Sequence, residues 1–436
     1  MRAGSAAMRL TIVADNSTEV NWGCRATSIA LRQLLSRDHE IVGTITRDLL
    51  KAPLTSSRRA TEDLHWGLTR RLRRPKLLRA PVAGRIATAV MDAGGRYHAP
   101  TDDAVRDGEL LWTLRETSPK ARRIVAAIAG CDAIVVNGEG EMIFSTPPRP
   151  TLRQTLAICA LAGRMGKRVF YVNGMISRPP DGRVDAATVA AAAGVLAGAQ
   201  VAVRDHHSVD VAAELLPGIA PPFFADSLFT WRRHFAETAT ARYDASRVSS
   251  WFERTGTAMP AVCNTSFVAI SGSSSAAPRP VEAAARYTEL VGALKALGLP
   301  MLLMPTCLGD NFLHRVARRT GVPIMPADAP IMACAAVAAN AQLLVSGRWH
   351  PSIMAALGGT PCVFLGSNSH KTLSIQHLLR YDDPVEYGAL PSAEDIAQVV
   401  LRARGLLKGG MGARARVSEA AAAMEASAGG LQGFVR

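Results

Sequence analysis

Short apolar runs alternate with longer amphipathic segments along most of this 436-residue chain. In the first half the apolar runs lie at residues 10–14, 40–45, 133–137, 168–173 and 200–203. Segments with helical periodicity separate them, such as 26–35, 151–165 and 186–197. This alternation is typical of βα units and predicts a parallel sheet with helices on both faces. We therefore expect a doubly wound, Rossmann-like domain over residues 1–225.

The second half repeats this pattern with different residues. Strands are expected at 266–271, 300–305, 323–325, 342–346 and 361–365, and helices at 281–297, 312–320, 329–339 and 351–357. We expect a linker at 226–262, a second Rossmann-like domain at 263–405, and a C-terminal helix and tail packed on the outside at 406–436. Two doubly wound domains facing each other across a cleft predict a GT-B-like arrangement, with ligands bound between the carboxyl ends of the two sheets.

Composition narrows the class of protein. With 48% hydrophobic and 20% charged residues, the chain is neither disordered nor collagen-like nor a coiled coil. The seven cysteines are widely scattered and form no CxxC pair, which excludes zinc-ribbon and thioredoxin motifs and indicates reduced thiols. No secretory signal is evident, and the longest apolar stretch, 184–203, is too weakly hydrophobic to span a bilayer. We expect a cytoplasmic protein, at most peripheral to the inner face of the plasma membrane.

The charge balance predicts anionic partners. Fifty basic and 36 acidic residues give a net charge of +14, which suits phosphorylated metabolites, nucleic acid or an acidic membrane. Residues 70–79 lie within a basic insertion at 51–120 and carry six basic residues and no acid. This segment is a candidate for contact with anionic lipid headgroups, and the alternative is a solvated surface. Nucleic acid is not expected as a partner, because no known nucleic-acid-binding motif is present.

Candidate chemistry follows the predicted strands, where a parallel sheet presents backbone amides and helix N-termini to anions. After the first strand, Asn21 and Gly23 precede a helix whose N-terminus would bind phosphate or carboxylate, unless this is an ordinary βα turn. A glycine turn at 138–140 follows Asn137 and contains Glu139. Glu139 is a candidate acid–base residue, and the alternative is a solvated loop carboxylate.

Two further strand ends carry cations. Arg204 follows the strand at 200–203 and is a candidate carboxylate or phosphate clamp. The adjacent His206 and His207 are expected in the first turn of a helix rather than in a metal site. Arg348 and His350 follow the strand at 342–346, and Lys371 lies one strand later. Together they predict a site for a dianion with a proton donor, the alternative being a chance group of surface cations.

These motifs resemble the polysaccharide pyruvyl transferase family. The resemblance rests on Asn21-Trp-Gly23, Asn137-Gly-Glu-Gly140, Val203-Arg204-Asp205 with Ser208, Ala225-Asp226, and Arg348-Trp-His350 followed 21 residues later by Lys371. It implies a GT-B-like, metal-independent enzyme without a cofactor. Such enzymes use phosphoenolpyruvate as the donor substrate and transfer pyruvate to two hydroxyls of a sugar as a cyclic ketal.

The resemblance also implies roles for individual residues. Arg204, Arg348, His350 and Lys371 would surround phosphoenolpyruvate, with Trp349 and Ser352 also on the donor side. The acceptor side would comprise Asn21, Gly23, Asn137, Asn173 and Asp226. Histidine titrates near neutrality, so His350 is expected to protonate the donor, unless Lys371 does so while His350 positions the phosphate. Glu139 or Asp226 would be the base for the sugar hydroxyl.

The expected acceptor is a bacterial cell-surface polysaccharide or its lipid-linked precursor, which would place the reaction in cell-envelope biosynthesis. The alternative function is that of a GT-B glycosyltransferase with a nucleotide-sugar donor, because such an enzyme would share the architecture and a basic cleft.

Overall fold

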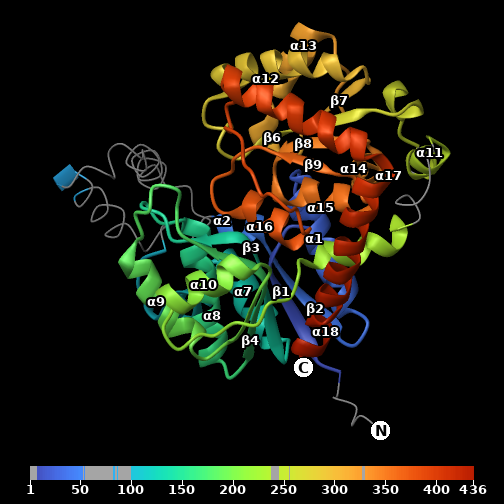
Figure 1. The fold of residues 1–436 in the computed structure, drawn as a ribbon. Helices are drawn as coiled ribbons and strands as arrows, with labels where there is room; N and C mark the ends of the chain where they lie inside the picture. Colours follow the sequence, from blue (N-terminus) through green and yellow to red (C-terminus); the bar gives the residue numbers. More distant parts are fainter. Residues whose placement is uncertain are drawn as a thin grey trace. The chain divides into compact units, whose positions relative to one another are not determined.

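The chain folds into two compact units, each built on its own parallel sheet (Figure 1). The computed structural model describes residues 7–52, 54, 82–83, 86, 100–236, 245–254, 256–326 and 329–436. The first unit comprises Met1–Asn16, Leu31–Phe224 and Leu431–Arg436, and the second comprises Ser17–Ala30 and Ala225–Gly430. The basic segment 70–79 lies outside the described residues.

This division differs from the predicted boundaries. Residues 226–262, expected to be a linker, are part of the second unit, because Leu228, Phe229 and Trp231 are buried there. Residues 17–30 also belong to the second unit, and the last six residues belong to the first. Helix α1 (Trp22–Leu35) is therefore shared between the two units.

The first unit has a five-stranded parallel sheet. Its strands are β1 (Arg9–Asp15), β2 (Glu40–Thr46), β3 (Ala133–Ile143), β4 (Arg168–Ser177) and β5 (Gln200–Val203), in the order β2-β1-β3-β4-β5. Successive residues of β3 enter different cores, with Ile134 and Val136 in one and Ala133 and Val135 in the other. A strand covered on both faces reads as a continuous apolar run, which is why the pattern predicts a doubly wound sheet.

Several helices of the first unit begin at favourable capping residues. The helices of this unit are α2 (Arg47–Lys51), α6 (Ala104–Thr113), η1 (Leu114–Glu116), α7 (Pro119–Ala129), α8 (Pro150–Arg164), α9 (Ala186–Leu196), α10 (His206–Leu215) and α18 (Leu431–Phe434). Asp103, Ser118, Asp185 and Asp205 each accept a hydrogen bond from a backbone N–H in the first turn that follows. Each such cap is worth roughly 0.5–2 kcal/mol.

The second unit has a four-stranded parallel sheet in the order β7-β6-β8-β9. Its strands are β6 (Val268–Ser273), β7 (Met301–Met304), β8 (Leu343–Gly347) and β9 (Cys362–Phe364). Its helices are η2 (Ser227–His234), α11 (Ala245–Glu253), η4 (Ala261–Asn264), α12 (Pro280–Leu294), η5 (Lys295–Leu297), η6 (Leu308–Asp310), α13 (Leu313–Thr320), α14 (Ile331–Asn340), α15 (Trp349–Leu357), α16 (Lys371–Leu378) and α17 (Ala393–Gly429).

Three segments differ from the expected secondary structure. The glycine turn predicted at 138–140 is part of β3, whose ladder with β4 continues to Ile143 after a register shift. The strand expected at 323–325 is reduced to one bridge, between Leu303 and Ile324. Residues 406–436, expected to form an outer tail, include the second half of α17. Val417 and Ala421 in this half are buried.

Both sheets have a switch point where the direction of winding reverses. In the first sheet β1 lies between β2 and β3, and in the second β6 lies between β7 and β8. The loops that follow the two strands at such a point diverge and leave a crevice for ligands. In the described part of the chain, no helix combines the length and the hydrophobicity needed to cross a membrane.

Candidate functional sites at the carboxyl ends of the two sheets

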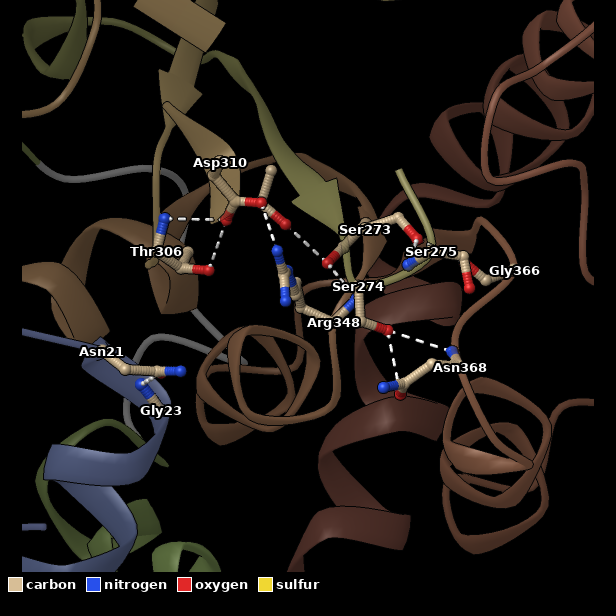
Figure 2. Close-up of polar contacts among 12 residues, drawn as sticks. Asn21, Gly23, Ser273, Ser274, Ser275, Thr306, Asp310, Arg348, Gly366 and Asn368 are labelled. Carbon is tan, nitrogen blue, oxygen red and sulfur yellow. Dashed lines mark hydrogen bonds and ion pairs between the residues drawn. The ribbon is translucent and has the colours of Figure 1, made fainter. Parts of the chain in front are cut away.

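Loops from all four strands of the second sheet contribute to one polar cluster (Figure 2). Ser273 ends β6, Asp310 follows β7, Arg348 follows β8 and Asn368 follows β9. The cluster includes the switch point between β6 and β8, where a doubly wound sheet binds its ligand. Sequence reasoning singled out only Arg348 among these four residues.

A buried carboxylate holds Arg348 in place. Asp310 is fully buried, and its Oδ1 accepts a hydrogen bond from Arg348 Nη2 at 2.5 Å. Its Oδ2 accepts from the backbone N and the hydroxyl of Thr306 at 3.0 and 2.9 Å. Burial by itself lowers the pKa of Arg348, but the charge and hydrogen bond of Asp310, together with the smaller effects of Cys307 and Tyr287, outweigh it, and the net shift of the pKa is upward. Arg348 is therefore a permanent, oriented cation.

A serine-rich loop after β6 lies beside Arg348. The Ser273 hydroxyl donates to the carbonyl of Gly366 at 2.5 Å and accepts from Ser275 N at 3.2 Å. Ser274 Oγ accepts from Asn368 N at 3.0 Å and lies 3.1 Å from Asn368 Oδ1. These contacts tie the loops after β6 and β9 together.

Lys371 joins the same cluster through Asn368. Its Nζ donates to Asn368 Oδ1 at 3.2 Å, and the residue opens helix α16. Two of the predicted donor-site cations, Arg348 and Lys371, are thereby linked to neighbouring loops of one sheet.

A second buried carboxylate orients His350. Its imidazole Nε2 lies 3.3 Å from Asp226 Oδ2, which also accepts from Trp349 Nε1 at 3.0 Å. Asp226 Oδ1 accepts from Thr27 Oγ1 at 2.6 Å and from Leu228 N at 3.0 Å. Since a carboxylate only accepts hydrogen bonds, Nε2 carries the proton of this contact, and Nδ1 is the second ring nitrogen. Asp226 is fully buried and serves as an orienting residue.

Gly23 makes room for that second nitrogen. A Cβ at position 23 would lie 2.4 Å from His350 Nδ1. Asn21 Oδ1 accepts hydrogen bonds from Gly23 N and Cys24 N at 3.0 and 3.3 Å, and Trp22 N donates to the carbonyl of Thr306 at 2.9 Å. Asn21 and Thr306 thus already accept hydrogen bonds from these three amides in the first turn of α1. The glycine is needed for close approach to the imidazole.

Trp349 and Ser352 have structural contacts in α15. Trp349 is buried with its indole N–H on Asp226, and Ser352 is fully buried and donates to the carbonyl of Arg348 at 2.7 Å. These contacts anchor the helix that presents Arg348 and His350, in contrast to the donor contacts expected for both side chains.

The first unit has a separate buried network, in which Asn16 directly after β1 meets residues in the middle of β3 and β4. Glu139 Oε1 accepts from Asn16 Nδ2 at 2.6 Å and from Asn137 Nδ2 at 3.1 Å. Asn173 Nδ2 in turn donates to Asn137 Oδ1 at 2.9 Å. Ala14, Glu139 and Asn173 have left-handed φ angles of 58°, 40° and 57°. Such backbone costs about 1–3 kcal/mol per residue and clusters at functional sites.

Arg204 lies in this first unit, where it follows β5. It is buried, and its backbone N–H donates to the carbonyl of Gly174 at 2.9 Å. Asp205 caps α10 by accepting from Ser208 N at 2.9 Å, and His206 and His207 lie in the first turn as predicted. Among the described residues, no group of three His, Cys, Asp or Glu side chains could hold a metal ion.

The predicted site residues therefore form two groups. The second unit contains Asn21, Gly23, Asp226, Arg348, Trp349, His350, Ser352 and Lys371, and the first contains Asn137, Glu139, Asn173 and Arg204. Sequence reasoning missed Asn16, Ser273, Ser274, Asp310 and Asn368. The run Ser271-Gly-Ser-Ser-Ser275 directly after a strand could have indicated the serine-rich loop, whereas nothing local distinguishes Asp310.

Comparisons with known proteins agree with the sequence motifs and the fold. The family model for polysaccharide pyruvyl transferase matches residues 23–369. No curated protein matches the chain. Among solved structures, the N-terminal domain of Candida albicans trehalose-6-phosphate phosphatase aligns with a TM-score of 0.53 and 11% identity over 98% of each chain. A Methanocaldococcus jannaschii UDP-GlcNAc 2-epimerase in complex with UDP-GlcNAc and UDP aligns with a TM-score of 0.49 and 12% identity, over 91% of this chain and 92% of its own. The GT-B-like fold is confirmed.

Proposed function

Because the chain belongs to the polysaccharide pyruvyl transferase family, we propose that it transfers pyruvate from phosphoenolpyruvate to two hydroxyls of a saccharide. The product is a cyclic ketal, and inorganic phosphate is released. The observation that carries this proposal is Arg348, which Asp310 holds at the switch point of the second sheet beside a serine-rich loop and Lys371. A fixed guanidinium and a nearby ammonium suit a small donor with a carboxylate and a phosphate.

The guanidinium of Arg348 can still donate a hydrogen bond to the donor substrate. Nη2 of Arg348 binds Asp310, while Nε is buried without a hydrogen-bond partner among the described residues. Buried polar atoms usually find a partner, so this N–H fits a ligand oxygen. Helix α15 begins at Trp349 without a side-chain cap, and its N-terminus would add to the attraction for phosphate. We propose that Arg348 and Lys371 bind the donor. Arg204 lies in the first unit, and the donor contact expected for it stays a prediction.

His350 is the proposed general acid. Protonated at both nitrogens and paired with Asp226, it would deliver a proton to C3 of the enol phosphate while a saccharide hydroxyl forms a bond to C2. The C2–O bond to phosphate then breaks, and a second hydroxyl closes the ketal ring. The two hydroxyls release two protons. One replaces the proton that C3 has gained, and the other leaves with the phosphate. Arg348 and Lys371 would stabilise the charge of the departing phosphate.

The network in the first unit is the proposed acceptor side. Glu139, held by Asn16 and Asn137, would take the proton from the attacking hydroxyl, and the amides of Asn137 and Asn173 would contact the saccharide. We propose a saccharide of a cell-surface polysaccharide or its lipid-linked precursor as the acceptor. Neither a metal nor a cofactor enters this scheme.

An assay with two alternative donors tests the function. The protein is given phosphoenolpyruvate or nucleotide sugars together with candidate saccharides, and phosphate, nucleoside diphosphate and ketal are measured. We expect phosphate and ketal in equal amounts. Nucleoside diphosphate release without consumption of phosphoenolpyruvate would instead support the glycosyltransferase alternative and overturn the proposal.

Variants separate binding from chemistry in the same assay. Arg348→Ala and Asp310→Asn should raise KM for phosphoenolpyruvate, because the first removes the cation and the second removes the carboxylate that orients it. His350→Gln should lower kcat by about 10²–10⁴-fold, the usual contribution of a general acid. Arg318→Ala, on the exposed surface of α13, is the matched control and should leave both constants unchanged. An active His350→Gln enzyme would contradict the general-acid role.

A further inference from the structure

Helix α17 contains a basic bend that the proposed reaction does not use. We call residues 401–416 the α17 elbow. Gly410 interrupts the helix there with φ 48° and ψ −126°. The elbow carries five basic residues and no acid, namely Arg402, Arg404, Lys408, Arg414 and Arg416. It lies far along the chain from the basic segment at 70–79.

One of these cations anchors the elbow to the core. Arg414 is buried and donates to the carbonyls of Ala339, Ala341 and Gly358 at 2.7–2.9 Å. These acceptors lie at the ends of α14 and α15, so Arg414 caps both helices. Arg414 therefore anchors the bend to the core of the second unit.

The rest of the elbow exposes both charged and apolar side chains. Arg404, Lys408 and Arg416 are exposed, and Leu401 and Met411 are 63% and 49% exposed. Exposed large apolar side chains among cations are typical of a helix that lies in a membrane interface. The elbow contains no aromatic residue, which argues against a surface that binds nucleic acid by stacking.

A cavity of about 560 Å³ adjoins the elbow. Arg380, Arg402 and Arg416 line it together with Leu401, while Asp382 and Asp383 contribute acidic groups. Arg380 follows α16 with a left-handed φ of 55°, a conformation that glycine would adopt more readily. The chain thus places a cation at a position where glycine is usual.

We propose that the α17 elbow docks on the surface of an anionic lipid bilayer. The exposed cations bind lipid phosphates, and one headgroup phosphate enters the cavity between Arg380, Arg402 and Arg416. Leu401 and Met411 enter the interface between headgroups and acyl chains. This surface is independent of the proposed reaction, since it rests on the elbow alone.

Helix α13 provides a matched control within the same unit. It exposes Arg315, Arg318 and Arg319, but its large apolar residues Leu313 and Val316 are buried. It therefore presents the same number of cations without an apolar contribution. If charge alone were responsible, both helices would bind lipid equally well.

Sedimentation of the full-length chain with vesicles tests the proposal. Vesicles of phosphatidylcholine alone are compared with vesicles that also contain phosphatidylglycerol. We expect binding only to the second kind, a reduction of about tenfold or more for Arg404→Gln/Lys408→Gln/Arg416→Gln, and a smaller reduction for Leu401→Ser/Met411→Ser. Arg315→Gln/Arg318→Gln/Arg319→Gln should bind like the wild type, and circular dichroism confirms that each variant is folded.

Three results would overturn the proposal. The first is an elbow variant that binds vesicles like the wild type. The second is an equal loss in the α13 variant, which would reduce the effect to net charge. The third is binding that disappears only when Arg70, Arg71, Arg73 and Arg74 are changed to Gln, which would assign the contact to the segment at 70–79.

Discussion

At the scale of single residues, the same arrangement positions both His350 and Arg348. Each side chain contacts a fully buried carboxylate, Asp226 for His350 and Asp310 for Arg348. Each arrangement also depends on a glycine, since a Cβ at Gly23 would lie 2.4 Å from His350 Nδ1 and one at Gly272 would lie 2.0 Å from Asp310 Oδ1. Removing one partner of the buried ion pair between Arg348 and Asp310 costs about 3–5 kcal/mol, so the geometry of the site and its stability are coupled.

The glycine in the first turn of α1 gives a residue-scale prediction. Gly23→Ala should displace the imidazole of His350 and lower kcat by about 10²-fold, because a displacement of about 1 Å can have that effect. Kinetics of ketal formation measures it. The control is Gly163→Ala, at an exposed position of α8 with open space around it. That change should retain activity and add about 0.5–1 kcal/mol of stability. A fully active Gly23→Ala enzyme would show that His350 tolerates displacement.

At the scale of elements, the strands buried on both faces could be predicted from the sequence, and strands with polar ends could not. The apolar run 133–137 identifies β3, but its extension over Gly138, Glu139 and Gly140 depends on pairing with β4, where Glu139 lies opposite Gly174 and Met142 opposite Ile176. That pairing is non-local, and the local residues favour a turn. The site residues show the same difference. Cations directly after predicted strands could be identified from the sequence, whereas the role of Asp310 depends on its contact with Arg348, which is 38 positions away in the chain.

A buried lysine in α7 gives an element-scale prediction. Lys120 donates to the carbonyls of Leu50 and Ala52 near the end of α2 and to Gln154 of α8. Burial lowers its pKa from 10.5 to about 8, so between these values the unfolded chain binds a proton that the folded chain lacks. Above pH 10.5 Lys120 is neutral in both states, and its burial does not lower the free energy of unfolding. That stability is lost as the pH falls through 8, because the buried amine must then be protonated.

Urea titrations of the wild type and Lys120→Met check this sign. Relative to the variant, the free energy of unfolding of the wild type should rise by up to about 3 kcal/mol from pH 8 to 10.5. Lys295→Met, at an exposed position, controls for the loss of one surface charge. A difference that does not change with pH would show that the three acceptors offset the desolvation of the ammonium.

At the scale of the whole molecule, the chain passes between the two units more often than the sequence pattern indicates. The pattern assigned residues 17–30 to the first domain and residues 431–436 to an outer tail, whereas they belong to the second and the first unit, respectively. Hydrophobic periodicity reports that a helix has an apolar face, but it carries no information on which sheet covers that face. The backbone bond from Trp22 to Thr306 is an example of a contact that no local pattern indicates.

The C-terminal residues give a prediction at this scale. Leu431 and Val435 are fully buried in the first unit, and the carbonyl of Val435 lies 2.7 Å from Nε2 of the buried His39. Leu431→Ala should lower the free energy of unfolding by about 2–5 kcal/mol. Gln432→Ala, one position along, should change it by less than about 0.5 kcal/mol. Thermal unfolding measures both, and a neutral Leu431→Ala would show that the C-terminus does not stabilise the first unit.

The sharing of α1 between the units limits how members of this family could be recombined. A chimaera joined at residue 225 would combine the His350 of one parent with the Asn21 and Gly23 of another, although these residues pack in one unit. Sequence differences between the two parents would then directly change how the imidazole packs against residues 21–23. Functional hybrids should therefore exchange residues 17–30 together with 225–430, so that both segments of the second unit always come from the same parent.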